Sequence, residues 1–160
     1  MDTVTSIAPF EWAPIGTSLL CGTIIGLERQ LRGKPVGIRT SALITLGTYL
    51  FIAASEVINP QLVEPTRVIG QVITGIGFLG AGVMLARDGV VLGVTSAATI
   101  WVLAAIGVCI AIGSLLAAIK LSVIVVAVLI GVDVLESYST AFTRGVHRRY
   151  KNWRGGTSQE

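Results

Sequence analysis

The stretch 74-TGIGFLGAGV-83 places four glycines within ten residues, and Gly75 to Gly80 match the G-x-G-x-x-G pattern of a dinucleotide-binding turn. That pattern indicates a nucleotide site only where a strand precedes the glycines, a helix follows, and an acidic residue lies about twenty residues further on. Here the glycines lie inside Val68 to Ala86, a run without a charged residue, and the region where the acid should lie reads SAATIW (96–101). The sequence therefore does not predict NAD binding, and the glycines need another explanation.

The composition is that of a membrane protein. Of 160 residues, 52% are hydrophobic and only 13% are charged, against about a quarter in an ordinary soluble domain. The mean hydropathy is +0.79. No secretory signal peptide is expected, because Asp2 and Glu11 precede the first apolar run without a Lys or Arg. Cys21 and Cys109 lie in apolar segments and indicate neither a disulfide framework nor a metal site.

Five segments have the length of a transmembrane helix, which needs roughly 17 to 25 residues. They are 12–30, 38–56, 67–86, 93–112 and 115–137, all approximate. The sequence predicts an all-α integral membrane protein, a bundle of about five transmembrane helices within residues 1–140, followed by a basic cytoplasmic tail at 141–160. A tight turn at Gly113-Ser114 is expected between the last two helices.

Positive residues collect in cytoplasmic loops and so indicate orientation. Ten of the twelve follow the first, third or fifth segment, namely Arg29, Arg32, Lys34, Arg39, Arg87, Arg144, Arg148, Arg149, Lys151 and Arg154. This distribution predicts an N-out/C-in arrangement. The basic tail with its aromatic residues is interpreted as an anchor on anionic lipid rather than a nucleic-acid site, since it directly follows a membrane span.

Small residues allow helices in lipid to approach closely, which gives the glycines a structural purpose. We interpret a set of them as helix-packing positions or as the lining of a pathway: Gly22, Gly26, Gly75, Gly77, Gly80, Gly82 and Gly107. Gln71 and Thr74 are expected to form hydrogen bonds between helices, with contact to a substrate as the alternative.

Four motifs resemble the MgtC/SapB family of bacterial membrane proteins. They are GLERQ (26–30), GIRT (37–40), QVITGIGFLGAG (71–82) and GVTSAATIW (93–101), within a likeness that runs from about residue 16 to residue 113. The resemblance implies a multi-pass protein of the bacterial inner membrane. In the family such proteins are linked to growth under low magnesium and to survival inside hosts.

The resemblance also bears on the kind of activity to expect. Early members of the family were labelled magnesium transporters, whereas the family's best-discussed roles involve regulating other membrane proteins. Longer members continue into a soluble cytoplasmic domain, and we expect this chain to represent the transmembrane domain without it. Thr95-Ser96 stands where Thr-Thr or Asn-Thr would be expected.

Polar residues recur at the predicted cytoplasmic ends of the helices. This predicted cluster comprises Glu28, Arg29, Arg39, Thr40, Arg87, Asp88, Thr95, Ser96 and Asp133. Ion pairs such as Glu28 with Arg39 would explain it structurally. A binding pocket is the alternative: its carboxylates could hold hydrated Mg²⁺, or its arginines and the N-terminus of the fourth helix could hold an anion or an acidic partner. The interleaved arginines favour the anion slightly.

No nucleophile with a base at motif spacing is present, and His147 is the only histidine, so the sequence predicts neither an enzyme nor a cofactor. Two functions remain. The first is a regulatory or accessory protein that contacts another inner-membrane protein through its helix faces and polar cluster. The second is a transporter or channel for Mg²⁺ or a small anion. The expected surroundings are the lipid bilayer and a homo-oligomer, with a dimer favoured, and no nucleic acid.

Overall fold

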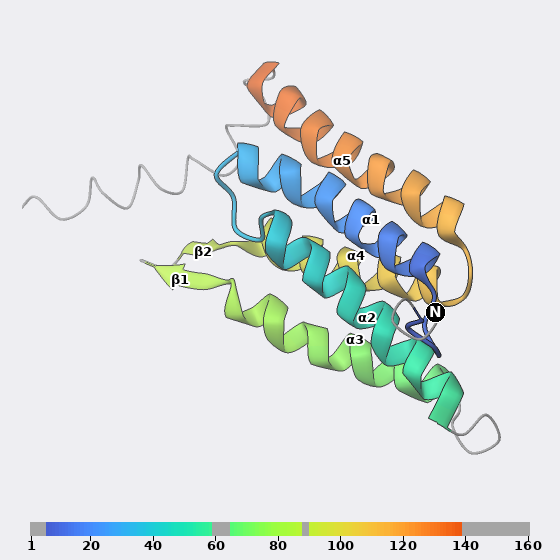
Figure 1. Ribbon diagram of the computed structural model, residues 1–160. Coiled ribbons are helices and arrows are strands. Elements are labelled where there is room, and N and C mark those ends of the chain that lie inside the picture. Colours follow the sequence, from blue (N-terminus) through green and yellow to red (C-terminus); the bar gives the residue numbers. More distant parts are fainter. Residues whose placement is uncertain (1–5, 59–64, 88–89, 139–160) are drawn as a thin grey trace, which may run out of the picture. The chain divides into compact units, whose positions relative to one another are not determined.

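The computed structural model describes residues 6–58, 65–87 and 90–138, and Figure 1 shows their arrangement along the chain. The elements are α1 (Trp12–Leu31), α2 (Ile38–Ile58), α3 (Pro65–Gly82), β1 (Leu85–Arg87), β2 (Val90–Leu92), α4 (Val94–Ala111) and α5 (Leu115–Tyr138). Over these residues the fold consists of five helices and one short hairpin. The predicted tail at 141–160 lies outside the described residues.

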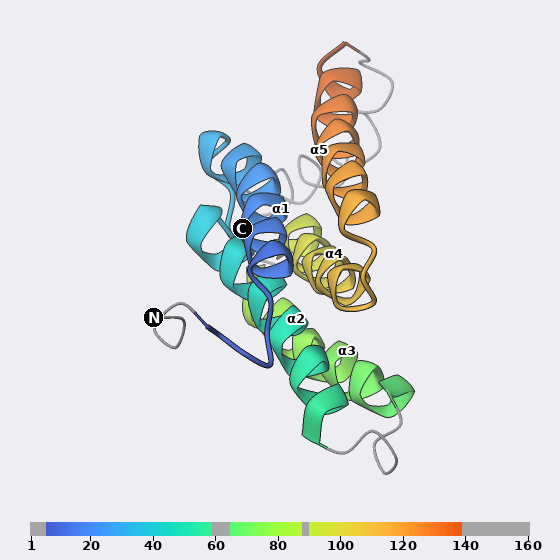
Figure 2. The ribbon, with the colours of Figure 1, turned by 45° about the vertical axis from the view of Figure 1, so that its right-hand side comes forward.

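The chain divides into two compact units within α5, and each is described by itself. The first, Met1–Ile124, holds α1 to α4 and the first residues of α5, and the second, Val125–Glu160, holds the remainder of α5. In the first unit α1 packs along α2, α2 also packs on α4, and α4 contacts α3 (Figure 2). The core of this unit contains Cys21, Ile25, Ile44, Ile52, Ile100, Leu103 and Ile110.

Apart from α3, each helix follows a predicted segment closely, because the apolar runs are bounded by charged residues or by glycine. After α1, Gly33 has φ +62°, and the N–H of Lys34 returns to the carbonyl of Arg29 at 2.9 Å. After α4, Gly113 has φ +80°, and the N–H of Ser114 returns to the carbonyl of Cys109 at 3.0 Å. These backbone bonds close the ends of the two helices with a left-handed glycine.

The third predicted segment differs from the structure. A helix was expected to run to residue 86, but α3 ends at Gly82, and the chain continues as an antiparallel hairpin in which Leu85 pairs with Leu92 and Arg87 with Val90. Short apolar runs do not distinguish a strand from a helix by periodicity alone. The Asp-Gly pair at 88–89 between the paired residues is a strong hairpin signal and could have identified this element.

Three of the helices are long and apolar enough to cross a membrane: α2 over Ile38–Val57, α4 over Val94–Ala111 and α5 over Leu115–Leu135. The other two, α1 and α3, include polar positions such as Glu28 and Gln71. Large apolar side chains are exposed on every helix, including Leu43, Phe51, Phe78, Trp101 and Leu116. Exposed apolar surface on this scale suits contact with lipid rather than water.

Candidate functional site

The described residues of the predicted cluster in the first unit lie at one end of its helices. We call this the polar end: α1 ends there, α2 begins, α3 leads into the hairpin, and α4 begins (Figure 1). A short turn joins α1 to α2, and the hairpin joins α3 to α4. Chain connectivity therefore holds the four helix ends together in two pairs. The polar end is the place where the charged side chains of α1 meet the first turn of α4.

The central contact of the polar end joins Arg29 to Ser96. Nη2 of Arg29 donates a hydrogen bond of 2.6 Å to the hydroxyl of Ser96, across 67 positions of sequence. Both residues are buried, with 4% of Arg29 and 2% of Ser96 exposed. Arg29 reaches α4 because it follows Ser18, Cys21 and Ile25 on the buried face of α1. A guanidinium in this position is oriented by the packing of two helices.

Glu28 is also buried, and its partner differs from the expected one. Its Oε1 lies 2.8 Å from Nε of Arg32, one turn later on the same helix. Neither carboxylate oxygen accepts a geometrically aligned hydrogen bond among the described residues, so the contact is an ion pair only. The predicted pairing with Arg39 is wrong. The side chain of Arg39 is exposed, whereas the side chain of Arg32, four positions after Glu28, lies close enough to form the ion pair.

The first turn of α4 follows a left-handed glycine. Gly93 has φ +89° and no side chain caps the helix. The N–H of Ala97 makes the first helical bond, to the carbonyl of Gly93 at 2.9 Å, which leaves the N–H groups of Val94, Thr95 and Ser96 without a helical acceptor. The positive end of the helix dipole therefore lies at the polar end, next to Arg29.

The other members of the predicted cluster are more dispersed. Arg39 and Thr95 are exposed, and Thr40 lines a groove described below. The side chain of Arg87 and all of Asp88 lie outside the described residues. Asp133 is exposed and belongs to the second unit. Arg29 and Ser96, both members of the predicted cluster, are brought into contact by the structure, although no bond between them was predicted.

The predicted packing glycines fall into two groups. Gly22 and Gly26 lie where α1 crosses α2, since a β-carbon there would stand 2.5 Å from Cα of Ala42 and 2.6 Å from Cα of Ile38. Gly107 allows the same approach between α4 and α2. Gly80 has ordinary contact with Ala97, whereas β-carbons at Gly75, Gly77 and Gly82 would meet no atom within 4 Å. Three of the four glycines in the opening stretch thus face open space in the single chain.

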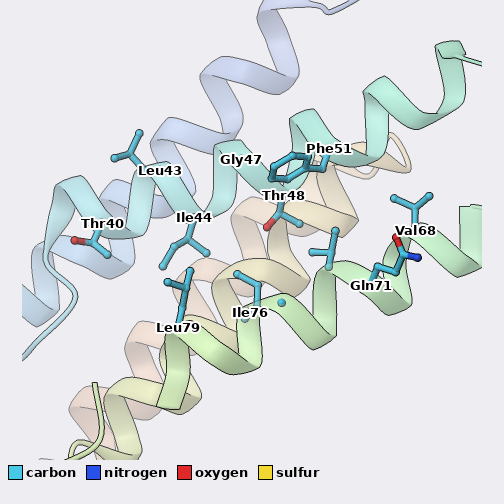
Figure 3. Close-up of a pocket in the computed structure, with 12 residues that line it drawn as sticks. Thr40, Leu43, Ile44, Gly47, Thr48, Phe51, Val68, Gln71, Ile76 and Leu79 are labelled. Carbon is cyan, nitrogen blue, oxygen red and sulfur yellow. The ribbon is translucent and has the colours of Figure 1, made fainter. Parts of the chain in front are cut away.

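A groove of about 620 Å³ separates α2 from α3. Figure 3 shows Ile44 and Thr48 directed from α2 toward α3, with Ile76 and Leu79 facing them. Gly47 and Gly75 line the groove from opposite helices, and their missing side chains leave the space open. The sequence indicated Gly75 and Gln71 as alternative lining of a pathway or substrate site, but it did not identify the opposite wall on α2, which includes Gly47 and Thr48.

Gln71 and Thr74 occupy different positions around this groove. Gln71 lines it, while the hydroxyl of Thr74 donates to the carbonyl of Gly70 at 2.9 Å, one turn back in α3. The expected hydrogen bond from Thr74 to another helix is therefore replaced by a bond within its own. In the described ranges, no three His, Cys, Asp or Glu side chains are grouped as metal ligands would be.

The apolar helices, the exposed apolar surface and the confinement of buried charge to one end define a helical membrane protein. The chain belongs to the MgtC family, whose model matches residues 15–138. The Escherichia coli K12 protein named "Putative magnesium transporter YhiD" is 46% identical over 103 residues, which cover 60% of this chain and 47% of that protein.

Two further relatives carry the name "Protein MgtC". The Salmonella typhimurium LT2 protein is 40% identical over 108 residues, covering 68% of this chain and 46% of its own length. The Brucella abortus protein is 36% identical over 124 residues, covering 73% and 52%. The chain thus spans about half the length of these curated relatives. No solved structure gives a significant match.

Proposed function

We propose that this MgtC-family chain is a regulatory or accessory protein of the bacterial inner membrane that acts in adaptation to low magnesium. In this proposal all five helices span the membrane, the N-terminus is outside, and the polar end faces the cytoplasm. The protein forms a homo-oligomer, with a dimer favoured, and contacts another inner-membrane protein through its helix surfaces. Its role is not enzymatic.

The exposed face of α3 carries this proposal. Phe78 is 81% exposed, and Gly75, Gly77 and Gly82 have open space where a side chain would lie. Helices in lipid associate through close packing at small residues, because lipid chains are as apolar as the side chains they would replace. An exposed surface that combines small residues with an amide, that of Gln71, suits a second helix better than lipid.

The cytoplasmic placement of the polar end is supported by its charges. Arg29, Arg32, Lys34 and Arg39 all lie in the last turn of α1, in the following loop or at the start of α2. Positive residues close to the ends of membrane helices are retained in the cytoplasm. A cysteine placed in the loop at Gly33 should react with an impermeant maleimide only after the cells are opened.

The experiment that tests the helix-contact role uses Gly77→Leu, with Gly16→Leu as a matched control in α1. Both glycines have nothing within 4 Å, so each variant should keep the thermal stability of the wild type in detergent. We expect Gly77→Leu to lose complementation of low-magnesium growth in a strain that lacks the gene, while Gly16→Leu complements. Full complementation by Gly77→Leu would show that the exposed face of α3 is not the surface through which the protein contacts its partner.

Transport is the second candidate, favoured by the groove between α2 and α3. It extends from Thr40 to Phe51 along α2, which corresponds to about 16 Å at 1.5 Å per residue, and contains the polar side chains of Thr48 and Gln71. The name of the Escherichia coli relative also points to magnesium transport. Five spans in one chain are few for a transporter, so this role would require an oligomer.

Flux through purified protein in liposomes separates the two candidates. Mg²⁺ and phosphate uptake would be followed under an imposed potential for the wild type, for Gly47→Leu and for Gly16→Leu. A β-carbon at position 47 would meet no atom within 4 Å, so a leucine side chain there would extend into the groove. Flux that only Gly47→Leu abolishes would establish transport through the groove. No flux from folded, correctly inserted protein would leave the regulatory role.

A further inference from the structure

Among the described residues, the buried guanidinium of Arg29 has no carboxylate partner. Its Nη2 is bonded to the neutral hydroxyl of Ser96, and its Nε has no acceptor within the part of the chain that the structure describes. Only 4% of the residue is exposed. Burying a charge without a partner is strongly unfavourable, and buried arginines are accordingly paired with an acid or with a ligand.

In the part of the chain that the structure describes, the carboxylate next to Arg29 is that of Glu28, and it does not provide that partner. Glu28 lies 2.8 Å from Nε of Arg32, so its charge is already matched. Glu28, Arg29 and Arg32 together carry a net charge of +1. Because Glu28 pairs with Arg32, the unmatched charge is that of the buried Arg29. Arg39 adds a further positive charge at the same end on an exposed side chain. The local field at the polar end therefore favours an anion.

The groups beside Arg29 are donors. Ser96 accepts the bond from Arg29 through its oxygen, which leaves its hydroxyl proton for another acceptor. Ser96 is the third residue of α4, whose first N–H groups have no helical acceptor and whose N-cap, Gly93, supplies no side chain. A guanidinium, a hydroxyl and the amino end of an 18-residue helix thus converge at one place.

We propose that this place is a binding site for a phosphate oxyanion, held by Arg29, the hydroxyl of Ser96 and the first N–H groups of α4. Phosphate fits each group: its oxygens accept from the unsatisfied Nε and from backbone N–H groups, and its charge neutralises the excess at the polar end. Among the arginines of the predicted cluster, the anion is thus assigned to the buried Arg29 and not to the exposed Arg39.

Two sources could supply the same phosphate chemistry. One is free inorganic phosphate, and the other is the headgroup of a phospholipid, since the end of a membrane helix lies at headgroup depth. The lipid source rests on the proposed function insofar as it requires α1 and α4 to span the membrane. Binding at Arg29 and contact through α3 involve different surfaces and are tested by different measurements, so the failure of one proposal can be told apart from the failure of the other.

The test measures thermal stability of the full-length chain in detergent, freed of lipid, during titration with inorganic phosphate at ionic strength held constant with potassium chloride. A second arm compares phosphatidic acid with diacylglycerol, which lacks the phosphate. The variants are Arg29→Gln, Arg29→Lys and Ser96→Ala, with Arg39→Gln as the control that removes an exposed positive charge from the same end.

We expect phosphate, phosphatidic acid or both to raise the unfolding temperature of the wild type and of Arg39→Gln. The apparent affinity should fall by about tenfold or more in Arg29→Gln, because a hydrogen bond to a charged group is lost. Arg29→Lys keeps the charge without the planar fork and should be intermediate, as should Ser96→Ala, which removes one hydroxyl from a helix and keeps the fold.

The two arms identify the source. A response to inorganic phosphate alone assigns a free anion, a response to phosphatidic acid but not to diacylglycerol assigns a lipid headgroup, and a response to both assigns a site open to either. No response in folded wild-type protein overturns the proposal. So does a response that Arg29→Gln and Ser96→Ala retain in full, because the phosphate would then bind elsewhere.

Discussion

Gly22 of α1 lies against the backbone of Ala42 in α2, so closely that a β-carbon at position 22 would stand 2.5 Å from the Cα atom of Ala42 and 2.7 Å from its nitrogen. Four residues later Gly26 meets the start of α2 in the same way. The two helices are therefore in backbone contact over about one helical turn, and no rotamer change can relieve a side chain introduced there.

The first prediction is that Gly22→Ala destabilises the fold, by about 1–3 kcal/mol or more, as overpacking of a close contact usually does. The opposing atoms belong to the backbone, so the helices themselves must separate. Gly16→Ala is the control, because it lies in the same helix with nothing within 4 Å. Thermal unfolding in detergent should show a loss for Gly22→Ala alone, and equal stability of the two variants would contradict the crossing.

The second prediction concerns Gly107, where α4 meets α2. A β-carbon there would stand 2.6 Å from Cβ of Thr48 and 2.7 Å from the carbonyl oxygen of Thr45. We expect Gly107→Ala to lower the unfolding temperature and the yield of monodisperse protein, again by about 1–3 kcal/mol in stability. Gly131→Ala, in open surroundings on α5, should leave both unchanged. Similar losses in both variants would instead indicate a general intolerance of alanine.

The third prediction is that Glu28 is energetically coupled to Arg32 and not to Arg39. A double-mutant cycle with Glu28→Gln and Arg32→Gln should give a coupling energy in the lower half of the usual range of about 0.5–3 kcal/mol, because the arginine is partly exposed. The cycle with Arg39→Gln should be additive. Additivity with Arg32 together with coupling to Arg39 would restore the pairing that the sequence suggested.

The fourth prediction separates two costs at Gly93. Gly93→Ala places a side chain at φ +89° and against the carbonyl oxygen of Val83. Gly33→Ala places one at φ +62° with nothing within 4 Å, so it carries only the backbone cost, about 1–2 kcal/mol. We expect unfolding temperatures in the order wild type, Gly33→Ala, Gly93→Ala. A Gly33→Ala variant as unstable as Gly93→Ala would show that the contact with Val83 adds nothing.

The helices could be predicted from the sequence because a membrane span is a property of composition and length. The charge-free run from Val68 to Ala86 was nevertheless misread at its end, since an apolar run fits a strand as well as a helix once Gly80 and Gly82 have weakened the helix. The Asp-Gly pair that follows was the local signal for the hairpin. A hydropathy pattern identifies apolar runs and does not report turn residues of this kind.

The site was predictable in its location and less so in its contacts. Arg29 and Ser96 lie 67 positions apart, and the sequence indicated only that both would reach the same end of the bundle. Which arginine is buried depends on the rotation of α1 about its axis, and this rotation is fixed by Gly22 and Gly26 against α2. Sequence periodicity gave too weak a signal to predict which of Arg29, Arg32 and Arg39 has a buried side chain.

The contact between Gly93 and Val83 has a mechanical consequence. The carbonyl of Val83 follows directly on α3, and Gly93 directly precedes α4, so the two helices share a junction with no free space between their backbones. A sliding or tilting of α3 must displace the first turn of α4, where Ser96 holds Arg29. The junction therefore predicts that a partner bound to α3 and an anion bound at the amino end of α4 alter each other's affinity by the same factor, as thermodynamic reciprocity requires.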